Sequence, residues 1–299
     1  MQASALVDVL IVGGGPAGLA AALMLGRARR RVVVVDAGAP RNARVDAVHG
    51  LLGHSGVAPG ELLRAARAQL EPYAVTFVED EVTGIVRAEH GFIATTRRGR
   101  FEARKVLIAT GIRDVLPDVP GVQACWAKSV FVCPYCDGWE VRDRRLALWG
   151  PGDQADVAAG LTSWSADVVF FAASALTPAQ ARALARLQVR VVERPVRRLE
   201  HDEGQLRAVV VDDERVARDA LFLHFGQVQA SPLAESLGCV VSADGTLPTG
   251  RGEHTTVPGV FVAGDASEGL QQVSVASAEG VRAACAINAE LRKEDIGEV

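Results

Sequence analysis

Residues 7–18 read VDVLIVGGGPAG, a run of β-branched and apolar residues that ends in a glycine-rich turn. The residues after the turn are rich in alanine and leucine, and Arg31–Val35 is a second apolar run that ends at Asp36. A strand, a helix and a second strand at this spacing predict a right-handed βαβ unit in a parallel sheet. The stretch Val9–Gly26 carries no charge, but its glycines and Pro16 favour a strand, a turn and a buried helix over a membrane span.

The glycine-rich turn fits the pattern G-x-G-x-x-G, which binds the pyrophosphate of a dinucleotide where a strand leads into a helix. Gly13 permits the tight turn, Gly15 lets the backbone approach the pyrophosphate, and Gly18 lets the helix and the strand pack closely. Asp36 ends the next strand, where its carboxylate can accept hydrogen bonds from ribose hydroxyls. The predicted dinucleotide-binding residues are Gly13, Gly15, Pro16, Ala17, Gly18 and Asp36.

A second unit of the same design follows later in the chain. The apolar run Leu146–Trp149 precedes Gly150-x-Gly152-x-x-Ala155, an alanine-rich segment and the apolar run Val168–Phe171. We expect a strand, a helix and a strand again, and therefore an internal repeat of two nucleotide-binding-like domains. The segment Asp114–Gly121, with its prolines and glycine, predicts a domain boundary. The predicted fold class is α/β, with two Rossmann-like nucleotide-binding domains, the second inserted in the first.

The first glycine motif alone does not distinguish NAD from FAD. Near the end of the chain, Val260–Ala263 predicts a buried strand that closes on Gly264 and Asp265, before an alanine-rich helix over Val273–Leu291. Asp265 then lies at a strand-to-helix turn, where its carboxylate could accept hydrogen bonds from a ribityl chain. This placement favours FAD as the cofactor.

Residues 131–138 read FVCPYCDG and contain the cysteine pair that we expect to carry the chemistry. Two intervening residues let Cys133 and Cys136 form a disulfide if the pair lies on the first turn of a helix. The positive end of a helix also favours the thiolate, which raises reactivity. Asp137 could act as a general acid for a departing thiolate, or it could be an acidic residue of the first helical turn with no role in chemistry.

Other interpretations of this C-x-x-C motif agree less well with the rest of the chain. A zinc site needs four ligands, and the sequence has neither a second C-x-x-C nor a close histidine pair. A structural disulfide would be unusual in a cytosolic chain. The motif is similar to the glutaredoxin active site, which follows the first strand of a small domain, whereas here it lies between two nucleotide-binding-like units. We therefore predict a redox pair that faces a cofactor.

Composition narrows the partners of the chain. The 299 residues are 49% hydrophobic and carry a formal net charge of -4, so electrostatics gives no reason to expect nucleic acid or an anionic membrane as a partner. The five cysteines are too few and too scattered for a secreted disulfide framework, which makes the cytoplasm the expected location.

Taken in order, these motifs resemble the low-molecular-weight thioredoxin reductases and their relatives. The resemblance covers nearly the whole chain and rests on Gly13–Gly18, Asp36, Ala109–Gly111, Cys133–Asp137, Gly150–Ala155, Thr256–Gly259 and Ala263–Asp265. It implies an FAD domain made of both ends of the chain around a smaller central domain with the cysteines, in a homodimer. The expected bounds are 1–116 and 245–299 for the FAD domain and 117–244 for the central NAD(P)-binding-like domain.

The resemblance also implies roles for single residues. Cys136 would face the flavin, Cys133 would exchange with the external disulfide, and Asp137 would handle the proton. With it, the expected flavin site also includes Thr110, Gly111, Gly264, Asp265 and Gln272. The implied function is an FAD-dependent disulfide oxidoreductase that passes electrons between the flavin and the cysteine pair and on to a thioredoxin-like protein or a small disulfide or dithiol.

Two departures from the family argue against NADPH as the electron donor. Residues 170–176 read FFAASAL, without the basic residues that hold the 2′-phosphate of NADPH and without an acidic residue suited to NADH. Asp153, in the second glycine turn, would repel a pyrophosphate. Two alternatives therefore stay open: a dithiol oxidase or a reductase fed by ferredoxin or another flavin, and a non-catalytic flavin-binding redox sensor.

Overall fold

The computed structural model describes residues 6–298, which divide into two compact units. The first unit contains residues 6–43, 57–113 and 227–298, and the second contains residues 44–56 and 114–226. The second unit is therefore inserted in the first, and both contain a sheet with parallel strands flanked by helices, which confirms the predicted α/β class.

The bounds of the units differ from the expected domain bounds by three residues at 114–116, which belong to the second unit, and by longer segments at two places. Residues 227–244 belong to the first unit, because strand β16 (Gln227–Gln229) pairs with β7 (Ile112–Asp114) and helix α7 (Leu233–Ser236) buries Leu233 in a core of that unit. Residues 44–56 cluster with the second unit instead of the first. Both differences arise from contacts between distant segments, which leave no local pattern in the sequence.

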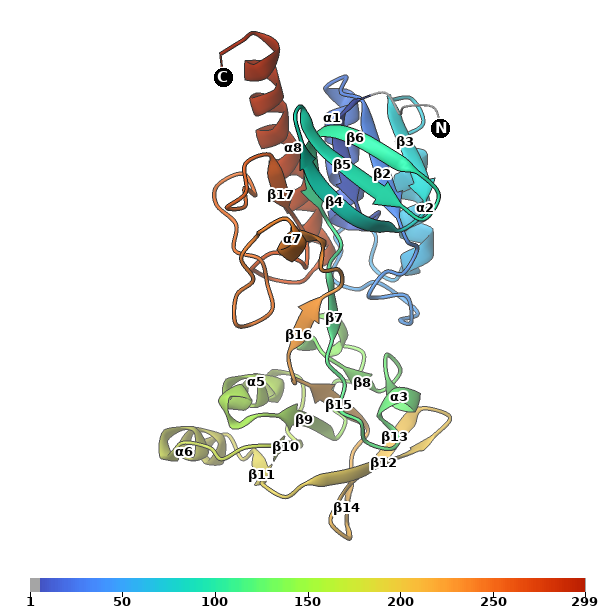
Figure 1. Cartoon of the computed structure of the whole chain (residues 1–299). Helices are drawn as coiled ribbons and strands as arrows, with labels where there is room; N and C mark the ends of the chain where they lie inside the picture. Colours follow the sequence, from blue (N-terminus) through green and yellow to red (C-terminus); the bar gives the residue numbers. More distant parts are fainter. Residues whose placement is uncertain (1–5, 299) are drawn as a thin grey trace. The chain divides into compact units, whose positions relative to one another are not determined.

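The first unit is built on a seven-stranded sheet with the order β3-β2-β1-β6-β5-β4, in which β17 pairs with β6 (Figure 1). Strands β3, β2, β1, β6 and β17 run parallel, whereas β4 and β5 form antiparallel pairs beside β6. The strands are β1 (Val7–Val12), β2 (Val32–Asp36), β3 (Val75–Glu79), β4 (Val82–Ala88), β5 (Gly91–Thr96), β6 (Arg100–Ile108) and β17 (Val260–Val262).

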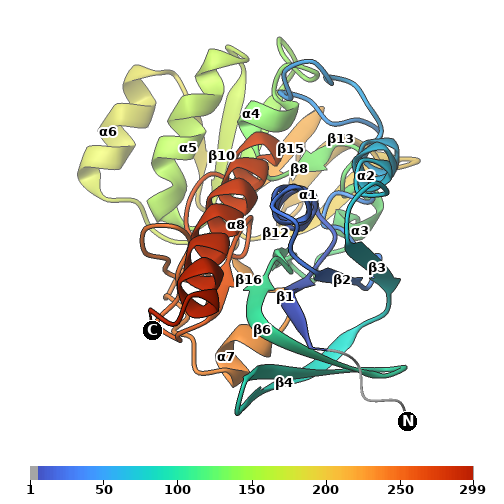
Figure 2. The same ribbon diagram turned by 90° about the horizontal axis from the view of Figure 1, so that it is seen from above.

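Helices α1 (Pro16–Arg27) and α8 (Val273–Asp295) lie side by side in this unit (Figure 2). The parallel pairing of β1 with β2 around α1 confirms the predicted βαβ unit. Gly280 of α8 lies against the backbone of Ala17 in α1. Helix α8 ends at Asp295, beyond the expected end at Leu291, and helix α2 (Pro59–Ala68) follows the segment 44–56.

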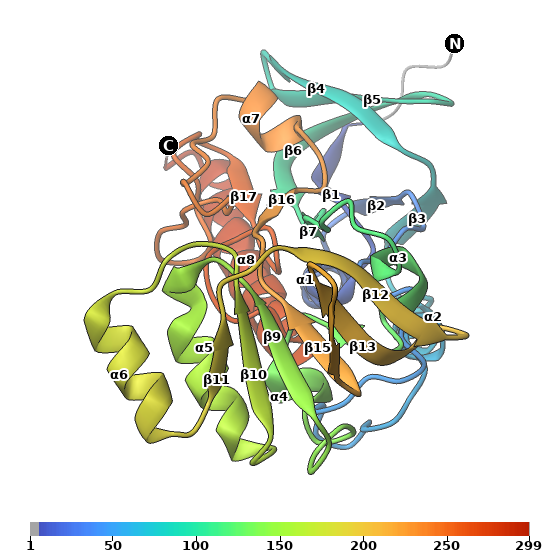
Figure 3. The same cartoon turned by 90° about the horizontal axis from the view of Figure 1, so that it is seen from below.

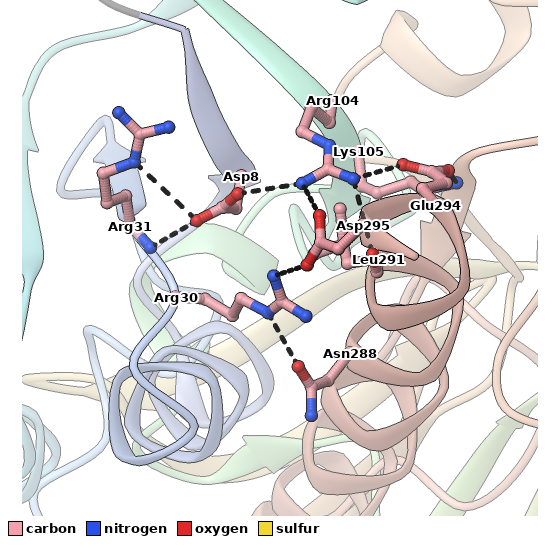
Figure 4. Close-up of polar contacts among 9 residues, drawn as sticks. All are labelled: Asp8, Arg30, Arg31, Arg104, Lys105, Asn288, Leu291, Glu294 and Asp295. Atoms are coloured by element: carbon pink, nitrogen blue, oxygen red, sulfur yellow. Dashed lines mark hydrogen bonds and ion pairs between the residues drawn. The ribbon is translucent and has the colours of Figure 1, made fainter. Parts of the chain in front are cut away.

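An ion-pair cluster fixes the last turns of α8 to strand β6 (Figure 4). Arg104 donates hydrogen bonds of 2.8 Å to both Glu294 and Asp295. The Nζ atom of Lys105 lies 2.6 Å from a carboxylate oxygen of Glu290 and 2.7 Å from one of Glu294. Because Lys105 is buried, these acidic residues balance a cation that would otherwise lie unpaired in the interior.

The second unit contains a five-stranded parallel sheet with the order β11-β10-β9-β15-β8 and a three-stranded antiparallel sheet of β12, β13 and β14 (Figure 3). The strands are β8 (Val130–Phe131), β9 (Leu146–Gly150), β10 (Val168–Ala172), β11 (Arg190–Val192), β12 (Val196–Asp202), β13 (Gln205–Val211), β14 (Glu214–Ala217) and β15 (Ala220–Leu223).

The helices of the second unit are short. They are α3 (Val122–Cys125), α4 (Pro134–Asp137), the 3-10 turn η1 (Gly152–Gln154), α5 (Ala155–Gly160), the 3-10 turn η2 (Leu161–Ser163) and α6 (Pro178–Arg186). A capping box between Thr177 and Gln180 begins α6. Among residues 6–298, no helix is both long and apolar enough to cross a membrane.

Candidate functional site

The first glycine turn of the chain places three glycines in very different surroundings. A β-carbon on Gly13 (φ +109°) would lie 2.2 Å from the carbonyl oxygen of Ala109, and one on Gly18 would lie 1.9 Å from that of Gly13. Both positions therefore require glycine for packing. At Gly15, in contrast, no described atom beyond the neighbouring residues of the chain lies within 4 Å of the added carbon. The turn is thus open at Gly15, where the sequence predicts the approach of a pyrophosphate.

Asp36 lies beside this turn, as its position at the end of β2 predicts. One carboxylate oxygen accepts a 3.0 Å hydrogen bond from the backbone N–H of Gly14, and the other lies 2.8 Å from a guanidinium nitrogen of Arg67. The Arg67 guanidinium also stacks over the ring of Phe77, 4.0 Å from its centroid. Sequence reasoning missed Arg67, because nothing in α2 marks which of its arginines faces β2.

Thr110 and Gly111 follow β6, next to Gly13. The Thr110 hydroxyl oxygen is buried, and no residue of the described chain provides it with a hydrogen-bond partner. Gly111 takes the left-handed conformation, with φ +67°. A buried polar atom without a partner is costly in a folded protein, so a ligand that bonds to this hydroxyl would relieve the cost.

Gly264 and Asp265 lie at the strand-to-helix turn after β17, where they were predicted. The backbone N–H of Gly264 donates a 2.8 Å hydrogen bond to Glu279, a buried carboxylate that sequence reasoning missed. Burial raises the pKa of Glu279. The Asp265 carboxylate lies 3.1 Å from Arg41. Gln272 is the N-cap residue of α8, and its side chain makes no capping hydrogen bond there.

The residues of the first unit fit a dinucleotide such as FAD. The turn is open at Gly15, α1 begins there without a side-chain cap, and the Thr110 hydroxyl lacks a partner among the described residues. Helix α1 has 12 residues, long enough for its first turn to attract phosphate charge. The predicted residues of Gly13–Gly18, Asp36, Thr110, Gly111, Gly264 and Asp265 all belong to this unit.

The cysteine pair lies in the second unit as a disulfide. Cys133 and Cys136 are bonded with their Cα atoms 5.2 Å apart, within the usual range for disulfides. Cys133 is the N-cap residue of α4, and its carbonyl accepts the N–H groups of Cys136 and Asp137 at 3.1 Å. The spacing of the two cysteines therefore permits a disulfide, as the sequence predicts. Because α4 has only four residues, its dipole adds little to the reactivity of a thiolate.

Two residues near the disulfide have contrasting surroundings: Gly138 is tightly packed, and Tyr135 is exposed. A β-carbon on Gly138 would lie 2.4 Å from the carbonyl oxygen of Pro134 and 3.0 Å from the ring of Trp164. Tyr135, between the two cysteines, is 77% exposed and packs edge-on against Trp164. A partner molecule can therefore meet this tyrosine as it approaches the disulfide.

Asp137 is a partly buried carboxyl beside the disulfide. Burial raises its pKa to about 6, the negative charge of Glu140 adds to the rise, and His49 opposes it. The Nδ1 atom of His49 lies 3.5 Å from a carboxylate oxygen of Glu140. Because a general acid works best with a pKa near the working pH, Asp137 suits proton transfer at neutral pH. Sequence reasoning found Asp137 but did not connect it with His49 or Glu140.

A cavity of about 480 Å³ opens beside this carboxyl, within the second unit. Asp137, His49 and Glu140 all line it, together with Phe131 of strand β8. Its size lies in the range of small-molecule sites. Next to the cysteine segment, His224 bonds to the carbonyl oxygen of Val132 at 2.9 Å, and burial lowers the pKa of this histidine.

The second glycine turn differs from the first. A β-carbon on Gly152, the counterpart of Gly15, would lie 2.4 Å from the carbonyl oxygen of Ala175 and 2.8 Å from that of Ser174. The N–H of Gly152 donates to the Ser174 hydroxyl at 2.9 Å. The turn continues into a 3-10 turn and then α5, which has only six residues and Asp156 in its first turn. Backbone thus fills the space that is open at Gly15.

Comparisons with known proteins place this geometry in a family. The model of the pyridine nucleotide-disulphide oxidoreductases matches residues 7–280. The chain is 39% identical to the solved structure of HlmI, with a TM-score of 0.93 over 100% of this chain and 96% of that one. The solved thioredoxin reductase of Streptococcus pyogenes is 25% identical, with a TM-score of 0.89 over 97% of this chain and 100% of that one.

Comparison of sequences leads to the same family. The thioredoxin reductase of Claviceps purpurea is 31% identical over 91% of this chain and 90% of its own length. These similarities confirm the resemblance inferred from the motifs and do not favour the redox-sensor alternative. Because the family model spans both units and the relatives match over nearly their full length, the chain belongs to the pyridine nucleotide-disulphide oxidoreductases, as a thioredoxin-reductase-like FAD-dependent disulfide oxidoreductase.

Proposed function

We propose that the enzyme exchanges electrons with a thioredoxin-like protein or a small disulfide or dithiol at Cys133. The observation that carries the proposal is the Cys133–Cys136 disulfide with a carboxyl beside it, Asp137, whose pKa lies at about 6. Such a carboxyl can give a proton to a departing thiolate at neutral pH and take one from an attacking thiol in the reverse direction.

The exchange uses all three residues, Cys133, Cys136 and Asp137. With the pair reduced, the Cys133 thiolate attacks one sulfur of the partner disulfide, and the other sulfur leaves as a thiolate that takes the Asp137 proton. The Cys136 thiolate then attacks the Cys133 sulfur, which re-forms the disulfide and releases the second partner sulfur as a thiolate. Oxidation of a dithiol runs the same steps in reverse. When FAD is bound, it supplies or accepts the electron pair at Cys136.

The FAD would be held by residues of the first unit. We assign this role to Gly13, Gly15, Pro16, Ala17, Gly18, Asp36, Thr110, Gly111, Gly264, Asp265 and Gln272. The open turn at Gly15 and the partnerless hydroxyl of Thr110, among the described residues, support the assignment. The chain would act in the cytoplasm as a homodimer, which size-exclusion chromatography with light scattering would test.

The residues of the second unit do not fit NADPH. The backbone of Ser174 and Ala175 fills the space at Gly152, whose N–H is taken by the Ser174 hydroxyl. Asp153 and Asp156 add negative charge where a pyrophosphate would lie. Residues 173–176, which follow β10, contain no lysine or arginine for a 2′-phosphate. We therefore infer that the electrons come from, or go to, a redox partner other than NADPH.

Two experiments test these proposals separately. The Cys133→Ser and Cys136→Ser variants are expected to lose turnover with any disulfide or dithiol and to keep FAD, whereas Cys285→Ser, at an exposed free cysteine, should retain full activity. Full activity of either active-site variant would refute the exchange mechanism. In an anaerobic titration, NADPH and NADH should leave the flavin absorbance unchanged, and dithionite should bleach it. Bleaching by NADPH would overturn only the inference on the donor.

A further inference from the structure

His49 reaches the cysteine segment from a distant part of the sequence. It belongs to residues 44–56, which cluster with the second unit although they lie between β2 and α2. In that unit, His49 lines the same cavity as Asp137 and Glu140, and its Nδ1 atom is 3.5 Å from a Glu140 carboxylate oxygen. A base and two acids from separate segments thus meet at one cavity beside the disulfide.

The two neighbours of Asp137 act on it with opposite sign. A negative Glu140 disfavours the Asp137 carboxylate, whereas a protonated His49 favours it. The cavity has six further charged side chains in its lining: Arg44, Asp46, Lys128, Asp202, Glu203 and Arg207.

Four of these six residues contact one another in pairs. Arg207 lies 3.5 Å from Asp202, and Lys128 donates a 3.0 Å hydrogen bond to the carbonyl oxygen of Glu203. After burial, which is the largest cause, Glu140 and His49 are the charged groups that shift the pKa of Asp137. The His49–Glu140 pair therefore contributes two opposed charges to the local field at the proton donor.

We propose that His49 and Glu140 are positioning residues for Asp137, an opposed charge pair that decides whether this carboxyl holds its proton when a thiolate leaves. The inference rests on the exchange reaction proposed above. Neither residue touches the reacting sulfurs in this assignment. They act through Asp137, so their substitution should change the pH dependence of exchange and leave the mechanism itself intact.

The test measures exchange by the dithionite-reduced holoenzyme as a function of pH with two probes. Bis(2-hydroxyethyl) disulfide releases a basic alkyl thiolate that needs a proton, whereas 5,5′-dithiobis(2-nitrobenzoic acid) releases a stable aromatic thiolate that does not. Because the attacking Cys133 thiolate becomes more abundant as pH rises, the rate with the first probe is divided by the rate with the second, and this ratio should fall as Asp137 loses its proton. Glu140→Gln should move this fall to lower pH and His49→Gln to higher pH, each by about 0.5 unit or more.

The second probe and one more variant serve as controls. Exchange with the aromatic disulfide should show no such displacement in either variant, and Asp137→Asn should remove the fall in the ratio. Displacement in the same direction for both variants, or equal losses of rate with both probes at every pH, would show a merely structural role and overturn the inference.

A direct titration keeps this inference separate from the proposed function. In the oxidised holoenzyme labelled with ¹³C at aspartate carboxyls, the Asp137 signal is assigned by its loss in Asp137→Asn. Its titration midpoint should move down in Glu140→Gln and up in His49→Gln. An unmoved midpoint would refute the charge pair even if exchange proceeds. Absence of exchange with both probes, with moved midpoints, would instead count against the proposed function alone.

Discussion

Gly280 of α8 lies so close to α1 that a β-carbon added to it would be 2.1 Å from the carbonyl oxygen of Ala17. Ala17 belongs to the first turn of α1, the helix that follows the open glycine turn. The packing of the two helices therefore helps to determine where the start of α1 lies, and with it the geometry offered to a dinucleotide.

The Gly280→Ala variant should consequently lose both stability and flavin. Overpacking at a contact of this kind costs about 1–3 kcal/mol, and a displaced α1 should lower FAD occupancy. The matched change Gly160→Ala, at an exposed helical glycine with open space for the added carbon, should be neutral or stabilising by up to about 1 kcal/mol. Thermal unfolding and the flavin-to-protein absorbance ratio measure both effects.

Thr110→Val tests the buried hydroxyl without changing the shape of the side chain. If the hydroxyl bonds to FAD, its loss should weaken FAD binding by about 1 kcal/mol or more, roughly a fivefold rise in Kd. The apoprotein should be no less stable, because the hydroxyl has no partner among the described residues. Titration of apoprotein with FAD, followed by flavin fluorescence, gives the Kd.

Thr96→Val provides the contrasting control. The Thr96 hydroxyl donates to the Gly99 carbonyl oxygen and accepts from the N–H groups of Arg98 and Gly99. Its removal should lower stability by about 1–2 kcal/mol and leave the Kd for FAD unchanged. An unchanged Kd in Thr110→Val would remove Thr110 from the proposed site.

Asp137→Asn should stabilise the fold above pH 6 while it slows exchange. Burial raises the pKa of this carboxyl from 3.8 to about 6, so the folded state holds the proton more tightly than the unfolded state. The contribution of this carboxyl to the free energy of unfolding is therefore fully present below about pH 4. It is lost as pH rises through about 6, by roughly 2–3 kcal/mol in total. The neutral amide avoids this loss. Urea unfolding at pH 4 and pH 7.5 should show the gain only at the higher pH.

Lys105→Met should destabilise the protein near neutral pH because it removes one partner from each of Glu290 and Glu294, which keep His254 and Arg104, respectively. Burial acts to raise the pKa of Glu290, but hydrogen bonds from Lys105 and His254 outweigh it and lower the pKa. The stability that this pair contributes is therefore present at neutral pH and is lost as pH falls through the lowered pKa. We expect a loss of about 1–3 kcal/mol at pH 7 that shrinks in acid.

The matched change is Lys128→Met, at an exposed lysine that bonds only a backbone carbonyl, and its effect should stay within about 0.5 kcal/mol. Urea unfolding of both variants at pH 7 and pH 3.5 makes the comparison. An equal loss in Lys105→Met at both pH values would mean that packing, and not the ion pair, accounts for the effect.

The local patterns of the sequence predicted the elements well because each depends on neighbouring residues. The apolar runs and the glycine turn specify β1, α1 and β2, and two intervening residues place Cys133 and Cys136 within disulfide distance. The alanine-rich segment after Gly152 was a weaker guide. It predicts a full helix, but the α-helical stretch ends at Gly160 after six residues, and 3-10 turns flank it.

Contacts between distant segments were not predictable. The arginine that pairs with Asp36 comes 31 residues later, in α2, and the histidine beside Glu140 comes from a loop of another part of the chain. Burial of Glu279 is equally invisible in an alanine-rich helix, because its partners at Gly264 and Ser267 are backbone and hydroxyl groups with no pattern of their own. Such pairs depend on how the chain folds back on itself, which a single sequence does not reveal.

The membership of residues 44–56 in the second unit has a consequence for the modularity of the enzyme. Most of the second unit is the continuous segment 114–226, which could be excised or transplanted without residues 44–56. Such a fragment would keep both cysteines and Asp137 yet lack His49 and a wall of the cavity beside them. An exchange of this segment between relatives would therefore transfer the disulfide without its full acid–base surroundings.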